Sequence, residues 1–310
     1  MILIHDTDSL PAHSTVAAIG MFDGVHLGHL HTLNTLRHKA DSSQRQSLVV
    51  TFVNHPQHLL QPSAPPVPLI MPVDERLRLL DQAGVDYVLL LSFTPTLARL
   101  TATQFMAMLR DRWGVDGIVM GFNHRFGSDR LTRIEDYRHG GATVGIDVVK
   151  APEYPHATVS SSIIRRDIAS GDVAAANALM GHPFALEGIV EHGEHLGSAL
   201  GFPTANVGGF APHQLLPAAG AYAVRVATDN ATYAGMAGVG RRPTVSPGHL
   251  TTVEVNLFDC HDTLYGKRLR VEFFEFIRNE TKFDNEQQLR QQLEADRIQA
   301  IKILTKTSQQ

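Results

Sequence analysis

Two histidines three positions apart, His26 and His29, stand at the start of a helical pattern and directly after a glycine-rich turn. The turn follows the apolar run 16–19, which is typical of a buried parallel strand. Backbone N–H groups at a helix N-terminus favour anions, and Gly24 and Gly28 allow a phosphate to approach the backbone closely. Because imidazoles can donate hydrogen bonds to phosphate oxygens, this spacing predicts a nucleotide site suited to nucleotidyl transfer.

The same histidine pair could instead bind a metal ion or lie on the surface. A zinc site would need further Cys or His ligands nearby, and the one cysteine, Cys260, is far along the chain. The strand before the turn and the helix after it favour the nucleotide interpretation. No Walker phosphate loop is formed around Gly266 and Lys267. His261 stands where the motif needs its first glycine, and Arg268 stands where it needs Ser or Thr.

Length and charge restrict the class of protein. A chain of 310 residues favours two domains. Its 27 Lys and Arg against 31 Asp and Glu give a net charge of −4, which indicates no nucleic-acid partner. One cysteine fits a reducing compartment, and no stretch approaches the ~18 apolar residues of a membrane span. The N-terminus lacks the features of a signal peptide, so we expect a cytoplasmic protein that acts on small molecules. Its oligomeric state is left open.

Strand and helix patterns alternate over the first part of the chain. The expected strands are 16–19, 47–52, 87–91, 117–120 and 142–149, and the expected helices are 30–40, 74–83 and 103–113. Asp74 is expected to cap its helix. Apolar strands separated by helices predict a doubly wound, Rossmann-like parallel sheet with helices on both faces, whose ligands bind beyond the carboxyl ends of the strands.

The pattern changes after Phe184. Two helical pieces, separated by Gly171 and Asp172, precede strand patterns at 186–190, 222–228, 232–239, 251–258 and 269–277. Consecutive strands without intervening helices predict an antiparallel β-barrel. A closing helix is expected over 286–303, with Leu289, Leu293, Ile298 and Ile301 near its apolar face. We therefore expect two domains, 1–184 and 185–310.

Several motifs together resemble one known family. The longer ones are 20–29, 49–56, 121–127, 159–165 and 200–206, and the shorter ones are 240–244, 253–254, 264–266 and 278–283. On these segments the chain resembles the bacterial bifunctional riboflavin kinase/FMN adenylyltransferase (FAD synthetase) family over nearly its whole length. The resemblance implies a nucleotidyltransferase-type first domain and a riboflavin kinase barrel. It also implies ATP and Mg²⁺, with riboflavin converted to FMN and FMN converted to FAD and pyrophosphate.

For adenylyl transfer, the resemblance places His26 and His29 on the ATP phosphates and Arg165 on the departing pyrophosphate. The remaining ATP-binding candidates are Gly20, Phe22, Asp23, Gly24, Gly28, Asn123, Ser161 and Ser162. The flavin-binding candidates are Phe52, His55, Pro56 and Phe126. Helix capping by the serines, turn formation by the asparagine and a core role for the phenylalanines are the structural alternatives.

For the kinase reaction, the resemblance selects Glu254 as the base that takes a proton from the riboflavin 5′-hydroxyl. Thr204 and Asn206 would bind Mg²⁺ and position the ATP phosphates. The flavin end would contain Arg278, Glu280 and Phe283. The structural alternatives are an exposed strand carboxylate for the base, a turn for Thr204 and Asn206, and a surface ion pair and a core contact for the flavin residues.

Four positions depart from the family pattern. Asn123 stands where aspartate is usual, Ser198 where arginine is common, Gly238 where asparagine is common and Asn256 where histidine is common. Three of the four lie in the kinase half. An adenylyltransferase with a weakened kinase domain and a non-catalytic flavin-binding sensor or carrier therefore remain as alternatives. An adenylyltransferase for another phosphorylated vitamin would fit the first domain but leave the second unexplained.

Overall fold

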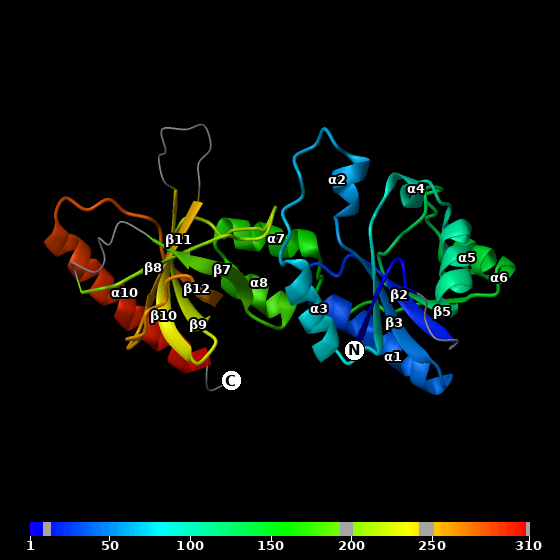
Figure 1. Ribbon diagram of the computed structural model, residues 1–310, viewed down its shortest axis with the longest axis horizontal. Coiled ribbons are helices and arrows are strands. Elements are labelled where there is room, and N and C mark those ends of the chain that lie inside the picture. The colour runs from blue at the N-terminus through cyan, green and yellow to red at the C-terminus, as the bar shows by residue number, and fades with distance from the viewer. Residues whose placement is uncertain (9–13, 193–200, 242–250, 308–310) are drawn as a thin grey trace. The chain divides into compact units, whose positions relative to one another are not determined.

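A computed structural model describes residues 1–8, 14–192, 201–241 and 251–307 (Figure 1). The chain divides into two compact units, Met1–Ser160 and Ser161–Gln310. The helices α7 (Ser161–Ser170) and α8 (Val173–Met180) belong to the second unit. Compactness does not show which reaction these helices serve, so the division into functional domains at 184/185 stays a prediction.

The first unit contains a six-stranded sheet in the order β1-β4-β3-β2-β5-β6, in which all neighbouring strands are parallel. The strands are β1 (Ile2–His5), β2 (Thr15–Ile19), β3 (Gln46–Phe52), β4 (Tyr87–Leu91), β5 (Val115–Met120) and β6 (Asp147–Lys150). The helices are α1 (Leu27–Ser42), α2 (Pro56–Leu60), α3 (Val73–Gln82), α4 (Pro95–Ala98), α5 (Ala102–Trp113) and α6 (Ile134–Thr143).

Helices cover both faces of this sheet. Val16 of β2 packs with Leu36 of α1 and Leu80 of α3, whereas Ala17 packs into a separate cluster with Leu109 of α5 and residues of α6. Successive side chains of a strand point to opposite faces, so β2 is buried from both sides. The predicted doubly wound parallel sheet is confirmed.

Two local predictions in this unit are wrong. The segment 142–149 is not one strand, because α6 continues to Thr143 and β6 begins at Asp147. A Cβ atom on Gly141 would lie 2.7 Å from the Ile146 carbonyl oxygen, so the helix end lies close against the chain that leaves it. Asp74 does not cap α3, because the cap position is Pro72 and no side chain bonds there.

The barrel of the second unit is closed, with strand order β10-β11-β8-β7-β12-β9 and antiparallel neighbours throughout. Its strands are β7 (Phe184–Glu191), β8 (Ala205–Gly208), β9 (Gly220–Ala227), β10 (Thr232–Arg241), β11 (Thr251–Leu257) and β12 (Arg268–Arg278). The predicted barrel is confirmed. So is the break between α7 and α8, where Asp172 Oδ1 accepts a hydrogen bond from the Ala175 N–H at 3.1 Å.

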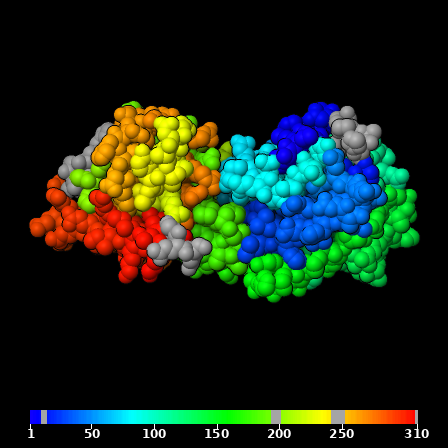
Figure 2. All heavy atoms as spheres, turned by 90° about the horizontal axis from the view of Figure 1, so that it is seen from below, coloured from blue at the N-terminus to red at the C-terminus, as the bar shows by residue number. Residues whose placement is uncertain are grey.

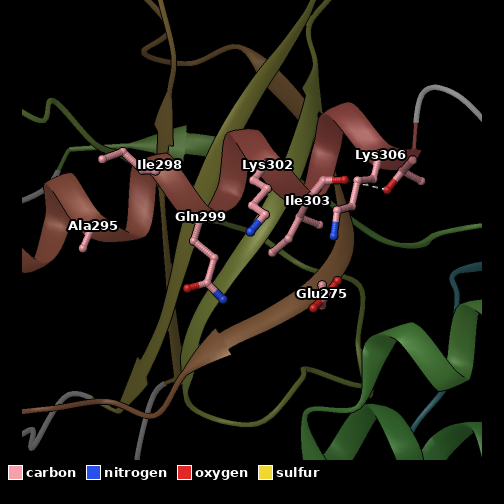
Figure 3. A pocket seen from close by; sticks show the side chains of 8 residues that line it. Glu275, Ala295, Ile298, Gln299, Lys302, Ile303 and Lys306 are labelled. Atoms are coloured by element: carbon pink, nitrogen blue, oxygen red, sulfur yellow. Dashed lines mark hydrogen bonds between the residues drawn. The ribbon is translucent and has the colours of Figure 1, made fainter.

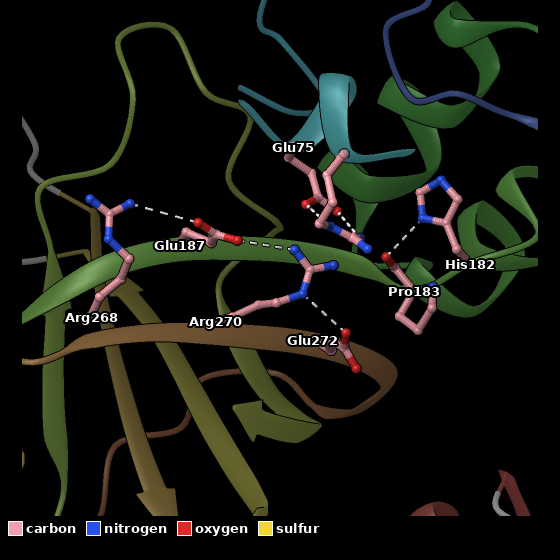
Figure 4. A network of polar contacts seen from close by, with 8 residues as sticks. Glu75, His182, Pro183, Glu187, Arg268, Arg270 and Glu272 are labelled. Carbon is pink, nitrogen blue, oxygen red and sulfur yellow. Dashed lines mark hydrogen bonds and ion pairs between the residues drawn. The ribbon is translucent and has the colours of Figure 1, made fainter. Parts of the chain in front are cut away.

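A row of charged side chains lies across β7 and β12 (Figure 4). The Arg270 guanidinium bonds Glu187 at 3.2 Å and Glu272 at 3.1 Å, and Arg268 approaches Glu187 at 3.7 Å. Each strand alternates these charges with buried apolar residues, so the row marks the outer face of the barrel.

Helix α10 (Glu286–Thr307) covers β9, β10 and β12. It buries Ala300, Ile303 and Leu304, while Ile298 is 70% exposed and Ile301 is 44% exposed. The predicted apolar face is therefore wrong for these two isoleucines. Figure 2 shows residues of α10, in red, at the surface of the second unit. Figure 3 shows a groove beside this helix, lined by Ile298, by lysines of α10 and by a glutamate of β12.

Candidate active sites

The histidine pair lies at the N-terminus of α1, as predicted. His26 is the N-cap residue, and its Nδ1 atom accepts a hydrogen bond from the His29 backbone N–H at 3.2 Å. The two rings stack with centroids 3.6 Å apart and planes inclined by 12°. Because Nδ1 of His26 accepts a bond, the neutral ring carries its proton on Nε2, where it is a hydrogen-bond donor. The pair thus combines imidazole donors with a helix N-terminus.

The turn before the histidines has an unusual backbone. Phe22 and Val25 have positive φ angles of 50° and 32°, a region that side-chain-bearing residues rarely adopt. The buried Asp23 carboxylate accepts hydrogen bonds from the backbone N–H groups of Ile70, at 3.0 and 3.2 Å, and of Met71, at 3.3 Å. Asp23 therefore anchors the turn to the segment before α3, and its predicted contact with ATP stays a prediction.

The turn lies at the switch point of the sheet. From β2 the chain passes to β3 on one side, and β5 joins β2 on the other side. Ligands bind at such points in open α/β sheets. Asn123 follows β5, as the histidines follow β2, so both reach the same sheet edge, and its side chain is exposed. A contact of Asn123 with the nucleotide stays a prediction.

His124, the neighbour of Asn123, is half-buried, and its Nε2 atom finds no hydrogen-bond partner among the residues that the structure describes. Burial lowers the pKa of this imidazole from 6.5 to about 4. It is therefore neutral at pH 7.

The predicted flavin residues of the first unit have structural contacts. Phe52 ends β3, is 7% exposed and packs edge-on against Phe93. Phe126 packs against Phe105 and Tyr137. Its backbone N–H donates a hydrogen bond to the Tyr137 hydroxyl, and its carbonyl oxygen accepts one from the same hydroxyl. The core role that was the alternative for both phenylalanines is thus confirmed.

His55 caps α2 through a 3.2 Å bond from the Gln57 N–H to Nδ1, and Pro56 is the first residue of that helix. Any contact of Phe52, His55, Pro56 or Phe126 with flavin stays a prediction.

Three further residues predicted for the adenylyl site lie in the first half of α7, in the second compact unit. Ser161 and Arg165 are half-buried and Ser162 is exposed. Their assignment to the adenylyl site stays a prediction.

In the barrel, the proposed base and a proposed metal ligand are direct neighbours. Glu254 of β11 lies opposite Asn206 of β8 in the antiparallel register. Directly opposed residues project to the same face of the sheet, with Cβ atoms ~5 Å apart. Val253 and Val255 are buried in the barrel, so Glu254 and Asn206 share the opposite, outer face. Thr204 lies two residues before Asn206. The register thus places Glu254 beside Asn206, and a shared site of Glu254, Thr204 and Asn206 stays a prediction.

Glycines leave space on the same face of the barrel. Gly238 of β10 lies opposite Glu254, and a Cβ atom added to it would meet no atom of the described residues closer than a backbone oxygen at 4.0 Å. Gly240 lies opposite Thr252, and its Cβ would lie 3.2 Å from the Glu280 Oε1 atom. The Glu280 carboxylate therefore extends over Gly240 toward the strand that carries Glu254.

Asn256 supports the loop that precedes β8. Its buried side-chain amide donates a 2.7 Å hydrogen bond to the Pro203 carbonyl oxygen. Asn256 thus links Glu254, two residues earlier on β11, to the segment that contains Thr204. Ser198, the other departure in this region, lies outside the described residues.

Arg278 makes an ion pair with α10. Its Nε and Nη2 atoms bond the Asp296 carboxylate at 3.0 and 2.8 Å, and Asp296 is 2% exposed. The Arg278 guanidinium also lies 5.6 Å from the centre of the Phe283 ring. The structural alternative for Arg278 was a surface ion pair, whereas the observed pair is with the buried Asp296. The flavin contacts of Arg278, Glu280 and Phe283 stay predictions.

The residues of the barrel face fit a hard cation. Thr204, Asn206 and Glu254 offer hydroxyl, amide and carboxylate oxygens, the donor types that Mg²⁺ prefers. Among the described residues, no three His, Cys, Asp or Glu side chains are grouped so as to hold a metal ion. A bound Mg²⁺ would thus share ligands between these oxygens and the phosphates of ATP, as is usual for this ion.

One functional candidate was missed by sequence reasoning. Arg76 of α3 is 3% exposed and bonds the Met21 carbonyl oxygen of the glycine-rich turn. In the sequence it stands among other charged residues beside Leu77, and this pattern does not identify a partner.

Comparisons with known proteins match both parts of the chain. The FAD synthetase family model matches residues 9–163 and the riboflavin kinase family model matches residues 180–304. Two relatives named bifunctional riboflavin kinase/FMN adenylyltransferase are those of Bacillus subtilis, 33% identical over 93% of this chain and 92% of the relative, and Escherichia coli K12, 35% identical over 96% and 95%.

A crystal structure of a protein from Streptococcus pneumoniae, named a macrolide-efflux protein, is 34% identical and matches with a TM-score of 0.87, over 96% of this chain and 98% of that one. Within the described ranges, no helix is both long and apolar enough to cross a membrane. The two family matches and the extent of the relatives together place this chain in the bifunctional riboflavin kinase/FMN adenylyltransferase family.

Proposed function

We propose that this chain makes FAD in two steps, each at its own site. Riboflavin is phosphorylated with ATP to FMN, and FMN is adenylylated with a second ATP to FAD and pyrophosphate. The observation that carries the proposal is the occurrence, in one chain, of a histidine pair at a helix N-terminus of a parallel sheet and of Glu254 opposite Asn206 in a barrel. Each arrangement suits one of the two phosphorus chemistries.

In the adenylyl step, an FMN phosphate oxygen attacks the α-phosphorus of ATP, and the bond to the β,γ-phosphates breaks. His26 and His29 donate hydrogen bonds to the phosphate oxygens, with the N–H groups at the start of α1 beside them. Arg165 holds the departing pyrophosphate with its planar fork, and Ser161 and Ser162 add hydroxyl donors. The protein contributes position and charge rather than a covalent intermediate.

In the kinase step, the riboflavin 5′-oxygen attacks the γ-phosphorus and ADP leaves. Glu254 accepts the proton of the 5′-hydroxyl. Thr204 and Asn206 would hold Mg²⁺, which supplies neutralising charge to the phosphates when bound.

We also propose that the enzyme acts in the cytoplasm on small molecules alone, without a nucleic acid or a membrane. The net charge of −4 and the one cysteine support this proposal.

Product analysis with each flavin tests the function directly. Purified protein with Mg-ATP is given riboflavin in one reaction and FMN in another, and flavins are separated by chromatography. We expect FMN and FAD from riboflavin, and FAD from FMN. If neither flavin is converted, the proposal fails, and tight flavin binding without turnover would identify a binding protein. FAD from FMN without any FMN from riboflavin would identify an adenylyltransferase alone.

Two substitutions separate the sites. His29→Ala should abolish most FAD formation and leave FMN formation near normal. Glu254→Gln should do the reverse, because the amide cannot accept the hydroxyl proton. Equal loss of both activities in a folded variant would contradict two independent sites.

A further inference from the structure

Arg76 of α3 is a buried cation that the two reactions above do not use. Its Nη1 atom donates a 2.7 Å hydrogen bond to the Met21 carbonyl oxygen, and its Nη2 atom donates one of 2.7 Å to the Phe52 carbonyl oxygen. Burial lowers the pKa of Arg76 to about 10 against the opposing effect of the Asp23 carboxylate. A buried arginine is costly unless its donors are used. Here Nη1 and Nη2 each bond a backbone oxygen, whereas Nε has no hydrogen-bond partner among the described residues.

Both oxygens lie at the carboxyl edge of the parallel sheet. Phe52 is the last residue of β3, and Met21 follows the end of the neighbouring strand β2 by two residues. Thr51 of β3 also donates to the Met21 oxygen, at 3.1 Å. The guanidinium is planar and its N–H groups diverge at fixed angles, so it sets the distance between the two carbonyls. Arg76 therefore joins the glycine turn to the end of β3.

The turn is strained and held from two directions. Met21 directly precedes Phe22, whose φ is 50°, and a residue in such a conformation keeps it only when its surroundings hold it there. Asp23 ties the turn to the backbone of Ile70 and Met71. Two residues beyond Met71, α3 begins and carries Arg76 back to Met21. The turn that leads into His26 is therefore bonded at Asp23 to the segment before α3 and at Met21 to α3 itself.

We infer that Arg76 is a positioning residue for adenylyl transfer, which fixes the turn that carries His26 and His29 relative to the end of β3. The inference rests on the proposed function. Arg76 acts through the Met21 and Phe52 carbonyls and does not itself touch the reacting atoms. The region after Phe52 holds the predicted flavin residues His55 and Pro56, so the same contact relates the ATP side of the site to the flavin side.

The test is Arg76→Lys in the full chain, with Arg37→Lys as the matched control. Arg37 also donates to a backbone oxygen of the first unit, that of Ala83 at 3.2 Å, but its side chain is exposed. A lysine ammonium lacks the fork that spans two carbonyls. We expect kcat for FMN to FAD to fall about 10- to 100-fold, because small misplacements of catalytic groups cost this much. KM for ATP should stay within about threefold, since the loss is of alignment rather than of ground-state binding.

Riboflavin to FMN conversion is measured in the same samples and should stay within about twofold of wild type, because the unit that contains Glu254 does not contain Arg76. Thermal unfolding of each variant checks that the first unit is folded. Arg76→Gln, which can reach one carbonyl, is used if the lysine variant does not fold. We again expect a lower kcat for FMN to FAD conversion and an unchanged riboflavin to FMN conversion. A kcat for FAD formation like that of Arg37→Lys overturns the inference. The inference is also overturned if kcat for FAD formation returns to the wild-type value when the assay is run well below the melting temperature of the variant, because the fall is then an effect of unfolding. If the wild type makes no FAD, the proposed function fails instead.

Discussion

The bond from Asn256 to the Pro203 carbonyl can be removed with little change in shape. Asn256→Leu keeps a side chain of similar volume and deletes the 2.7 Å hydrogen bond that holds the segment before Thr204. The Pro203 oxygen then loses its donor inside a partly buried site. Leaving such a group unpaired costs about 1–2 kcal/mol, at the lower end of the range for buried groups.

This cost translates into a rate if the segment must be held for phosphoryl transfer. About 1.4 kcal/mol corresponds to a tenfold change, so we expect kcat/KM for riboflavin phosphorylation to fall about 5- to 30-fold. Asn256→His, which restores the residue common in the family and can donate through a ring N–H, should recover most of the activity.

The assay is steady-state formation of FMN from riboflavin, with FMN to FAD conversion as an internal control that should not change. The reasoning is refuted if the leucine variant phosphorylates riboflavin within about twofold of wild type while its loop is folded. It is also refuted if both activities fall together, since the first unit does not contain this bond.

Three further predictions concern stability, measured by urea or thermal unfolding. Gly238→Ala should stabilise the barrel by about 0.5–1 kcal/mol, because its Cβ position is open, whereas Gly235→Ala should destabilise it by at least about 1 kcal/mol, because its Cβ would lie 2.6 Å from a backbone oxygen. Asp296→Asn should cost about 3 kcal/mol, because Arg278 loses a buried counter-charge. Because the pKa of His124 is lowered to about 4 in the folded chain, the unfolded chain binds a proton at this imidazole more tightly. The contribution of His124 to the free energy of unfolding is therefore complete above pH 6.5 and is lost as the pH falls toward 4. His124→Gln should remove up to about 2 kcal/mol of the fall in the free energy of unfolding between pH 7 and pH 5.

The strand, turn and helix around the histidine pair could be predicted because their signals are local. An apolar run, two glycines and a helical pattern all lie within 27 residues of one another, from β2 to the end of α1 (Thr15 to Ser42), and each signal has a direct physical cause. The barrel was predictable for a similar reason, since its strands alternate between buried and half-exposed residues.

The wrong predictions arise where tertiary packing decides. The apolar run 142–149 contains the end of α6, and Gly140 and Gly141 are tolerated inside that helix because it packs closely: a Cβ on Gly140 would lie 2.4 Å from the Thr103 side chain. Such an approach cannot be read from periodicity. Asp74 lies in the first turn of α3, where its charge suits the helix dipole, but the chain enters the helix at Pro72.

The contacts of Asp23 and Arg76 that hold the glycine-rich turn were not predicted, because their partners are distant in sequence. Asp23 bonds the backbone 47 and 48 residues away, and Arg76 bonds one 55 residues away. No spacing rule connects such positions, and each residue alone has an ordinary explanation as a surface charge. By contrast, Glu254 and Asn206 belong to predicted motifs, and the strand register then brings them together.

The two sites therefore depend on different kinds of restraint. In the barrel, a one-residue shift of register would turn every outer side chain inward, so the hydrophobic core itself keeps Glu254 beside Asn206. In the first unit, the histidines follow a strained turn that no sheet register fixes, and its position depends on the polar contacts of Asp23 and Arg76. A core strand moves little until the barrel unfolds, whereas a turn can shift by a fraction of an ångström while the sheet stays intact. Adenylyl transfer is thus the step in which substitutions remote from the reacting phosphorus should have graded effects on rate.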